Sequence, residues 1–390
     1  MTTLIRVKLY QIIFFIVLFI LNTACTHKKS VKKIEILKNH ADLFSISVRG
    51  VISLDDCSDS CLIGTIDKLT YFRKRFYILD VYHARTFFIY NNEGKLISKS
   101  KLGKGPGELI RPRTFYIDTL SNDTGSIFLF DDTKGIISFD LKGRYLGTQV
   151  NHGLEAYDIV RFDENSLLVY TTYPSMSDRK SGKSQEEMSW YIYALVDNSF
   201  KKDIRNFFPI YGRDDRLAIS LYTGMAFYKN EIKCLVPLDN NIYSFNGKTM
   251  NAEYYIDFGK LAITKSDIKQ GLDFIDPAIK NKIRAGRCYR LMETDQFMIF
   301  SYYFGQDKLF GIYSKKDKKA AVFNDILKRN NLPYNTAPIA CIGNKIICAI
   351  DVDELSNQDI NKNSIFNNCV LYNNPVLMFM NISTKQNTNQ

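Results

Sequence analysis

Short apolar runs, each closed by a polar turn, recur along most of the chain. They come in pairs, in which a strand-like run is followed by a polar connection and a second run with an aromatic residue. The six pairs are Arg75–Asp80 with Thr86–Tyr90, Ser126–Asp131 with Gly135–Asp140, Asn165–Tyr170 with Trp190–Leu195, Asn230–Val236 with Asn241–Phe245, Gln296–Phe300 with Leu309–Tyr313, and Asn344–Ile350 with Val376–Met380. Strand–turn–strand order without an intervening helix indicates antiparallel pairing.

The pairs follow one another at about 45–60 residues, the period typical of propeller blades. Two of them align residue by residue, Asn-Glu-Ile-Lys-Cys at 230–234 and Asn-Lys-Ile-Ile-Cys at 344–348. Asn246-Gly247 is hairpin turn chemistry, because Asn and Gly tolerate positive φ. The pattern therefore predicts an all-β fold, a single six-bladed β-propeller of four-stranded antiparallel blades over residues 34–384.

Two strand-like runs, Lys33–Leu37 and Leu43–Leu54, precede the first pair. We expect the N-terminal strand to complete the last blade and close the ring. Residues 385–390 are predicted to be a disordered tail.

A small helical insert is predicted at Thr264–Gly286, between blades four and five. Thr264 is expected to cap a turn that Gly271 ends. Asp276 and Pro277 are expected to be the N-cap and first residue of a second helix, and Gly286 to follow its end.

The first residues have the pattern of a secretory signal peptide. Arg6 and Lys8 precede an apolar run at Ile12–Leu21, which is too short to span a bilayer as a helix. Cys25 directly follows Ala24, which resembles the bacterial lipobox, although Asn22 stands where a branched aliphatic residue is usual. We interpret residues 1–24 as a lipoprotein signal peptide, Cys25 as the lipid anchor and residues 25–33 as a tether. The alternative is an ordinary signal peptide followed by a chance cysteine.

Composition supports a folded, exported domain. The chain is 45% hydrophobic and 13% aromatic, enough for a packed core. Its net charge of +11 becomes +9 once residues 1–24, with two basic and no acidic residues, are removed. Exported chains do not normally meet nucleic acid, so this charge does not predict a nucleic-acid partner.

Seven cysteines follow Cys25. Cys57 and Cys61 are four residues apart, close enough for a disulfide in an oxidising compartment. Free thiols or, less favoured, a metal site are the alternatives for this pair. The remaining five lie in apolar runs and are interpreted as buried small side chains, namely Cys234, Cys288, Cys341, Cys348 and Cys369.

The segment Gly103–Glu108 is rich in glycine but is not a phosphate-binding loop, because neither Lys-Ser/Thr nor a helical pattern follows it. We interpret it as a structural loop between blades. Its glycines would permit a tight turn, its proline would stiffen the loop, and its glutamate would accept backbone N–H bonds. The residues concerned are Gly103, Gly105, Pro106, Gly107 and Glu108.

These segments together resemble the six-bladed β-propeller lipoproteins of Bacteroides-type bacteria, distant relatives of NHL-repeat propellers. The similarity rests on the Gly-Pro-Gly-Glu loop and on supporting segments at Leu62–Gly64, Phe76–Asp80, Phe115–Asp118, Asp239–Tyr243 and Tyr255–Gly259. The resemblance implies a propeller fold and an outer-membrane location in the cell envelope. Thr26–Lys29 lacks the acidic residues of surface-exported lipoproteins in this group, which favours a periplasm-facing anchor.

Candidate chemistry is sparse. The four histidines, His27, His40, His83 and His152, show no ligand spacing, so we predict no catalytic residue, metal ligand or cofactor. Asp80 and Asp131 occupy the same place in their pairs, which indicates a repeated turn-capping role.

We therefore predict a membrane-anchored, monomeric binding or interaction module for an unknown protein, peptide or glycan ligand. One alternative is a propeller hydrolase or lyase acting on glycans or peptides, with carboxylates converging at the central channel. Another is a calcium-stabilised scaffold.

Overall fold

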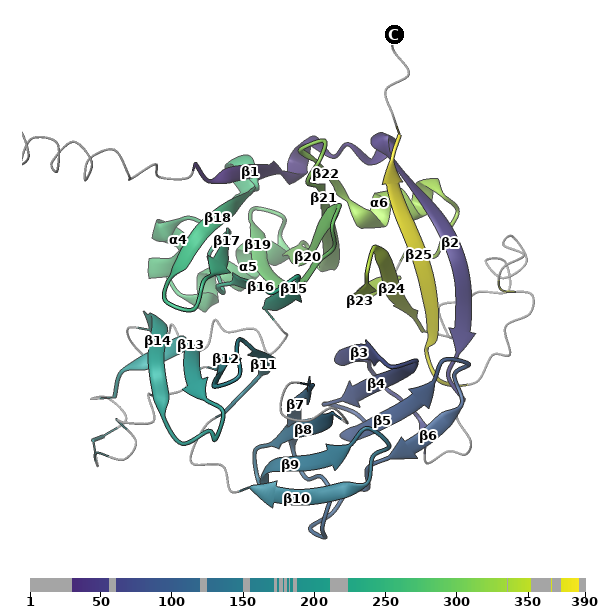
Figure 1. The fold of residues 1–390 in the computed structure, drawn as a ribbon. Helices are drawn as coiled ribbons and strands as arrows, with labels where there is room; N and C mark the ends of the chain where they lie inside the picture. The colour runs from purple at the N-terminus through teal and green to yellow at the C-terminus, as the bar shows by residue number, and fades with distance from the viewer. Residues whose placement is uncertain are drawn as a thin grey trace, which may run out of the picture. The chain divides into compact units, whose positions relative to one another are not determined.

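The computed structural model describes residues 30–55, 61–119, 125–149, 155–171, 188–210, 224–334, 336–351 and 373–385, and the single residues 174, 178, 181, 183, 184 and 366. The chain divides into a unit of residues 1–32 and a unit of residues 33–390, which holds nearly all of these. In this second unit, six antiparallel sheets form a ring (Figure 1). The predicted six-bladed β-propeller is confirmed.

Each blade begins with its innermost strand and proceeds outward. Blade 1 consists of β3 (Lys68–Phe72), β4 (Arg75–Asp80), β5 (Thr86–Asn91) and β6 (Leu96–Lys99). Blade 2 consists of β7 (Pro112–Asp118), β8 (Ser126–Asp131), β9 (Gly135–Asp140) and β10 (Tyr145–Gln149). Blade 3 consists of β11 (Asp158–Arg161), β12 (Ser166–Tyr170), β13 (Trp190–Asp197) and β14 (Asp203–Ile210). Blade 4 contains β15 (Met225–Tyr228), β16 (Glu231–Leu235), β17 (Asn241–Phe245) and β18 (Met250–Asp257). Blade 5 consists of β19 (Ala285–Glu293), β20 (Phe297–Phe304), β21 (Asp307–Ser314) and β22 (Lys319–Val322). The paired runs found in the sequence are the two middle strands of each blade.

Blade 6 is assembled from both ends of the chain. It contains β23 (Ala337–Ile342), β24 (Lys345–Ile350) and β25 (Val376–Thr384), and its outer strand is the N-terminal β2 (Phe44–Ser53). The pairing of β2 with β25 runs from Phe44 opposite Thr384 to Ser53 opposite Val376 (Figure 1). The predicted closure by an N-terminal strand is therefore confirmed.

The segment before β2 crosses two further blades. β1 (Lys32–Glu35) pairs with β18 as a fifth strand of blade 4, and is followed by the short 3₁₀ helices η1 (Ile36–Lys38) and η2 (Ala41–Leu43). Beside blade 5, the side chain of Asn39 accepts from the Val322 amide at 3.0 Å and donates to Asp325 at 2.6 Å. We call residues 33–53 the N-terminal strap. It joins blades 4, 5 and 6 along their outer edges.

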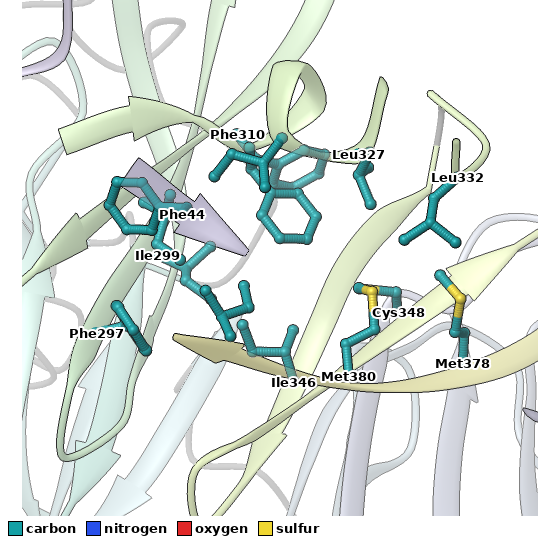
Figure 2. Packing of buried hydrophobic residues seen from close by; sticks show 14 of the residues in the cluster. Phe44, Phe297, Ile299, Phe310, Leu327, Leu332, Ile346, Cys348, Met378 and Met380 are labelled. Atoms are coloured by element: carbon teal, nitrogen blue, oxygen red, sulfur yellow. The ribbon is translucent and has the colours of Figure 1, made fainter. Parts of the chain in front are cut away.

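The core lies between neighbouring blades. The middle strands are covered on both faces, so all residues of β12 and the last five of β4 are buried. This explains why these strands form continuous apolar runs instead of an alternating pattern. Figure 2 shows one such layer, where β20, β24 and β25 pack against α6 (Phe323–Arg329). Burying each such side chain contributes about 1.5–3 kcal/mol.

The helical insert lies between blades 4 and 5, as predicted, but its second helix begins earlier than predicted. Thr264 caps α4 (Lys265–Lys269) through a capping box with Asp267. α5 (Leu272–Lys280) already begins after Gly271, because its apolar face at Ile275, Ala278 and Ile279 packs inward.

Two of the predicted positions at the second helix are therefore corrected. Pro277 lies inside α5, so Asp276 is not its N-cap. Gly286 does not follow a helix but is part of β19, where a Cβ would lie 2.8 Å from the Ile263 side chain. Glycine suits this position because its φ is +156° and the Ile263 side chain packs closely against it, and not because a helix ends here.

Two buried aspartates tie the middle of a blade to the segment that enters it. Asp131, 1% exposed, accepts from the amides of Ile110 and Arg111 through Oδ2, and from those of Thr133 and Lys134 through Oδ1. Asp80 accepts in the same way from the amides of residues 64, 65 and 83. Both aspartates therefore have the turn-capping role expected from their equivalent positions. Each also accepts hydrogen bonds from a second loop, the one that enters the blade.

In the described part of the chain, no helix combines the length and apolar character needed to cross a membrane.

Candidate functional site

A cavity of about 610 Å³ lies where the innermost strands of all six blades meet. These strands are β3, β7, β11, β15, β19 and β23, so each blade contributes to the lining. Cavities of this size that gather a few polar groups within an apolar wall are typical of small-molecule sites. Seven of the lining residues are aromatic, namely Tyr71, Phe72, Phe115, Tyr116, Phe162, Phe227 and Tyr228.

Buried ion pairs lie at the two ends of β11. At its first residue, Asp158 accepts from Nζ of Lys68 at 2.5 Å, and the same ammonium donates to Thr114 at 3.1 Å. At its last residue, Arg161 donates through Nη2 to Asp118 at 2.6 Å. Asp158 and Asp118 are almost fully buried, so each needs its cation nearby. The pairs thereby fix charged groups across three blades.

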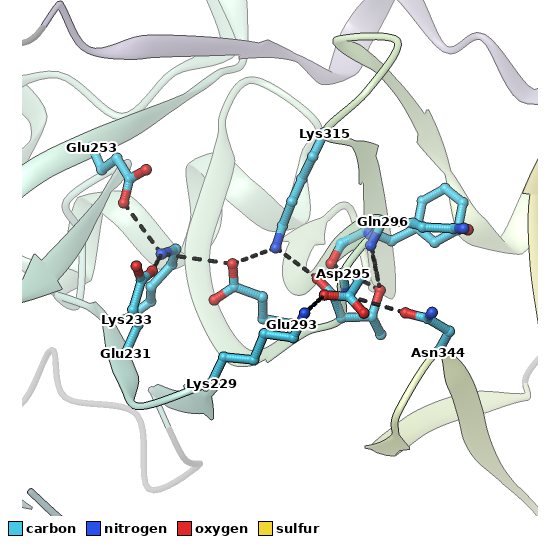
Figure 3. Close-up of polar contacts among 11 residues, drawn as sticks. Lys229, Glu231, Lys233, Glu253, Glu293, Asp295, Gln296, Lys315 and Asn344 are labelled. Carbon is cyan, nitrogen blue, oxygen red and sulfur yellow. Dashed lines mark hydrogen bonds and ion pairs between the residues drawn. The ribbon is translucent and has the colours of Figure 1, made fainter.

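On blade 5, Glu293 connects the cavity wall to a network of charges (Figure 3). Its Oε1 accepts from Nζ of Lys315 at 2.5 Å and lies 3.6 Å from Nζ of Lys233. Burial alone would lower the pKa of Lys233, but the hydrogen bond to Glu231 and the charges of Glu293 and Glu253 outweigh it and raise this pKa. The lysine therefore stays charged.

Arg290, also on β19, lines the cavity beside blades 6 and 1. Its guanidinium is buried, and Nη1 lies 3.4 Å from the carbonyl oxygen of Pro338. Burial and the charge of Arg290 lower the pKa of Lys308 to about 8, an effect that Asp67 partly offsets. Burial raises the pKa of Asp67, a cavity residue whose Oδ2 accepts from the Val81 amide at 2.7 Å. Two cations and one carboxylate thus act on one another at this end of the wall.

The predicted inter-blade loop lies between β6 and β7 and is not part of the cavity lining. Glu108 accepts from the Gly105 amide at 2.7 Å, and the Lys134 ammonium donates to the Glu108 carbonyl at 2.9 Å. Gly103 has φ +150°, and a Cβ there would collide with the Glu108 carboxylate. Gly107, with φ +72°, packs against Tyr145. The loop folds around its own glutamate.

The other predicted positions are only partly described. Cys25, Cys57 and Cys369 lie outside the described residues, so the lipid anchor and the disulfide of Cys57 with Cys61 stay predictions. Cys234, Cys288 and Cys348 are buried in the core, as predicted, and burial raises the pKa of each thiol. Cys341, also predicted to be buried, is only partly buried beside the core, and burial raises the pKa of its thiol to about 12.

Among the residues that the structure describes, no group of three or more His, Cys, Asp or Glu side chains is placed to hold a metal ion. The charged residues of the cavity were not singled out in the sequence. Two of them, Lys68 in β3 and Asp158 in β11, lie in short inner strands whose apolar run is interrupted by charge.

Comparison with solved structures supports the fold. BF0058 of Bacteroides fragilis, provisionally named an exported protein, superposes with a TM-score of 0.66 at 17% identity, over 91% of this chain and 99% of that one. A DUF4221 family member from Bacteroides vulgatus superposes with a TM-score of 0.51 at 11% identity, over 88% of this chain and 100% of that one. At such identities the likeness concerns the fold alone.

Comparison with curated proteins finds no match. The model of one family, described as "Domain of unknown function (DUF4934)", matches residues 52–381 and so spans most of the propeller. The chain belongs to the DUF4934 family.

Proposed function

We propose that this protein is a binding module that holds a small ligand in the central cavity and performs no covalent chemistry of its own. The observation that supports the proposal is the cavity itself, about 610 Å³ in volume and lined by all six blades. Ion pairs hold several of its charged side chains in place, and its apolar wall includes aromatic residues. Such a preformed site loses little freedom when a ligand binds.

The carboxylates of the cavity favour binding over hydrolysis. A glycosidase needs two carboxyl groups, one of which delivers a proton to the leaving group. Asp158 and Glu293 each have a lysine ammonium at 2.5 Å, so both carboxylates are already engaged by a cation of the protein. Burial raises the pKa of Asp67, as a general acid would require, but the two other carboxylates of the cavity wall, Asp158 and Glu293, are both engaged by lysines. These partners suit a fixed electrostatic wall better than an acid–base pair.

Binding is tested by filling the cavity. Thr70 of β3 lines it, so Thr70→Trp should weaken binding of any cavity ligand at least tenfold. The matched control is Thr148→Trp on the outermost strand of blade 2, which is exposed and should leave binding unchanged. Ligand-observed NMR on the full chain, with a set of small carboxylates, amines, sugars and amino acids, measures the effect.

Two results would contradict the proposal. One is that no compound of the set binds the unaltered chain at millimolar concentration. The other is that Thr70→Trp, still folded by circular dichroism, binds the same compounds as tightly as Thr148→Trp does.

We also propose that the protein is an envelope lipoprotein anchored through Cys25 and facing the periplasm. Support comes from the apolar run and cysteine at its N-terminus and from the name of its structural relative in Bacteroides fragilis. Cys25→Ser removes the thiol that would be acylated, so we expect the protein to move from the membrane fraction to the soluble fraction. Cell fractionation with an immunoblot measures this, and retention in the membrane would refute the anchor.

A further inference from the structure

The backbone of β19 is irregular where Arg290 lies. Tyr289 pairs with Ser301 of β20 and Leu291 pairs with Phe300, so Arg290 is an extra residue between two consecutive pairs. It has φ +47°, the left-handed region that residues with a Cβ rarely adopt. A bulge of this kind redirects a side chain, and bulges are frequent beside binding and active sites.

This irregularity has a cost. A left-handed residue other than glycine is disfavoured by roughly 1–2 kcal/mol. The side chain that the bulge directs is a guanidinium, only 5% exposed and in the cavity wall, where burying charge adds a further cost. A buried apolar side chain on a regular strand would avoid both. Outliers of this type are grounds for a functional hypothesis.

The surroundings of Arg290 differ from those of the other charged groups in the wall. Lys68 and Arg161 each lie within hydrogen-bonding distance of a buried carboxylate of their own, Asp158 and Asp118 respectively. Arg290 and a second cation, Lys308, instead both act on the same carboxylate, Asp67. The Lys308 ammonium also lies 5.1 Å from the ring centroid of Tyr289. This end of the cavity favours negative charge.

We propose that Arg290 binds the carboxylate of a small ligand whose apolar, aromatic body occupies the cavity. A planar guanidinium offers parallel N–H donors that match a carboxylate, and such charge-assisted bonds are strong in a buried site. The aromatic residues of the wall, with Phe227 and Tyr228 among them, suit a ring as the body of the ligand. The inference rests on the proposed function of the cavity and adds the class of its ligand.

The test compares two probes of the same shape, phenylacetate and its neutral amide, phenylacetamide, by titration calorimetry on the full chain. The unaltered chain should bind phenylacetate at least tenfold more tightly than the amide. Arg290→Met should weaken phenylacetate binding about 20-fold and leave the amide unchanged, and Arg290→Lys should lose less.

Arg287→Met is the matched control. Arg287 lies on the same strand with φ +52°, but it pairs with Asp276 at 2.5 Å and does not line the cavity. Its removal takes away the same charge and should leave phenylacetate binding unchanged. If Arg290→Met fails to fold, Arg290→Lys still decides the question, because a point-charge ammonium lacks the guanidinium fork.

The outcomes separate the two proposals. If both probes bind equally to the unaltered chain and Thr70→Trp blocks both, the carboxylate inference is wrong and the binding function stands. If the probes bind and Thr70→Trp blocks neither, the binding function itself is wrong. If neither probe binds at millimolar concentration, or if phenyl phosphate or phenyl sulfate binds more tightly than phenylacetate, the carboxylate assignment is overturned.

Discussion

Asp131→Ala is expected to lower the free energy of unfolding by about 4 kcal/mol. The carboxylate accepts four backbone N–H groups from two separate loops and is 1% exposed. An unsatisfied buried donor costs about 1–3 kcal/mol, and alanine would leave four of them, some of which water can reach after relaxation. Urea denaturation followed by circular dichroism measures the loss.

Two further variants serve as comparisons for Asp131→Ala. Asp131→Asn keeps the shape but replaces one acceptor oxygen with a donor, so it should lose roughly half as much. The exposed Asp42 makes a control, because Asp42→Ala should change stability by no more than about 0.5 kcal/mol. A loss below about 1 kcal/mol for Asp131→Ala would show that the aspartate does not hold the two loops together.

Lys308→Met is expected to stabilise the protein at pH 7 by about 3 kcal/mol. Burial and the charge of Arg290 lower the pKa of Lys308 from 10.5 to about 8, and each pKa unit corresponds to about 1.36 kcal/mol. Methionine keeps the length and packing of the side chain without its charge. The same variant should bind phenylacetate more weakly, because it removes one of the two cations beside the cavity.

The stability gained by Lys308→Met should depend on pH. Below pH 8 the lysine is protonated in both the folded and the unfolded chain, so the cost of burying its charge is fully present. Between pH 8 and pH 10.5 the folded chain loses the proton first, and the cost fades. The advantage of Lys308→Met should therefore be largest near neutral pH and absent above about pH 10.5.

A matched control is Lys282→Met. Lys282 is exposed and lies over the ring of Phe304 at 5.9 Å, so its removal should change stability by less than about 0.5 kcal/mol at any of these pH values. If Lys308→Met is less stable than the unaltered chain at pH 7, Lys308 is held by a compensating partner, and its charge does not oppose folding.

The sequence was most informative where burial is complete. The middle strands of each blade, such as β4 and β12, are covered on both faces, so they appear as uninterrupted apolar runs bounded by turns. The closure of the ring followed from the strand-like run before the first pair. The helical insert was placed correctly as a whole, but Pro277 suggested a helix start that packing of Ile275 overrides.

The candidate site was harder to predict, for a physical reason. Several inner strands are short, and β11 reads only Asp-Ile-Val-Arg, so it lacks a clear period. Lys68 and Asp158 could have been identified by one signal, a charged residue in the short apolar run that precedes a strand pair. No such signal exists for Arg290, because its direction depends on a bulge that is defined only by the register with β20.

The N-terminal strap also has a mechanical consequence. Tension applied at Lys33 acts first on β1, a four-residue strand that can be peeled from the edge of blade 4 one hydrogen bond at a time. The load then meets the side chain of Asn39, which is hydrogen-bonded to blade 5, and only afterwards β2, which has nine paired positions with β25. The strap should therefore detach in steps, and β1 should extend before the blade that closes the ring is loaded.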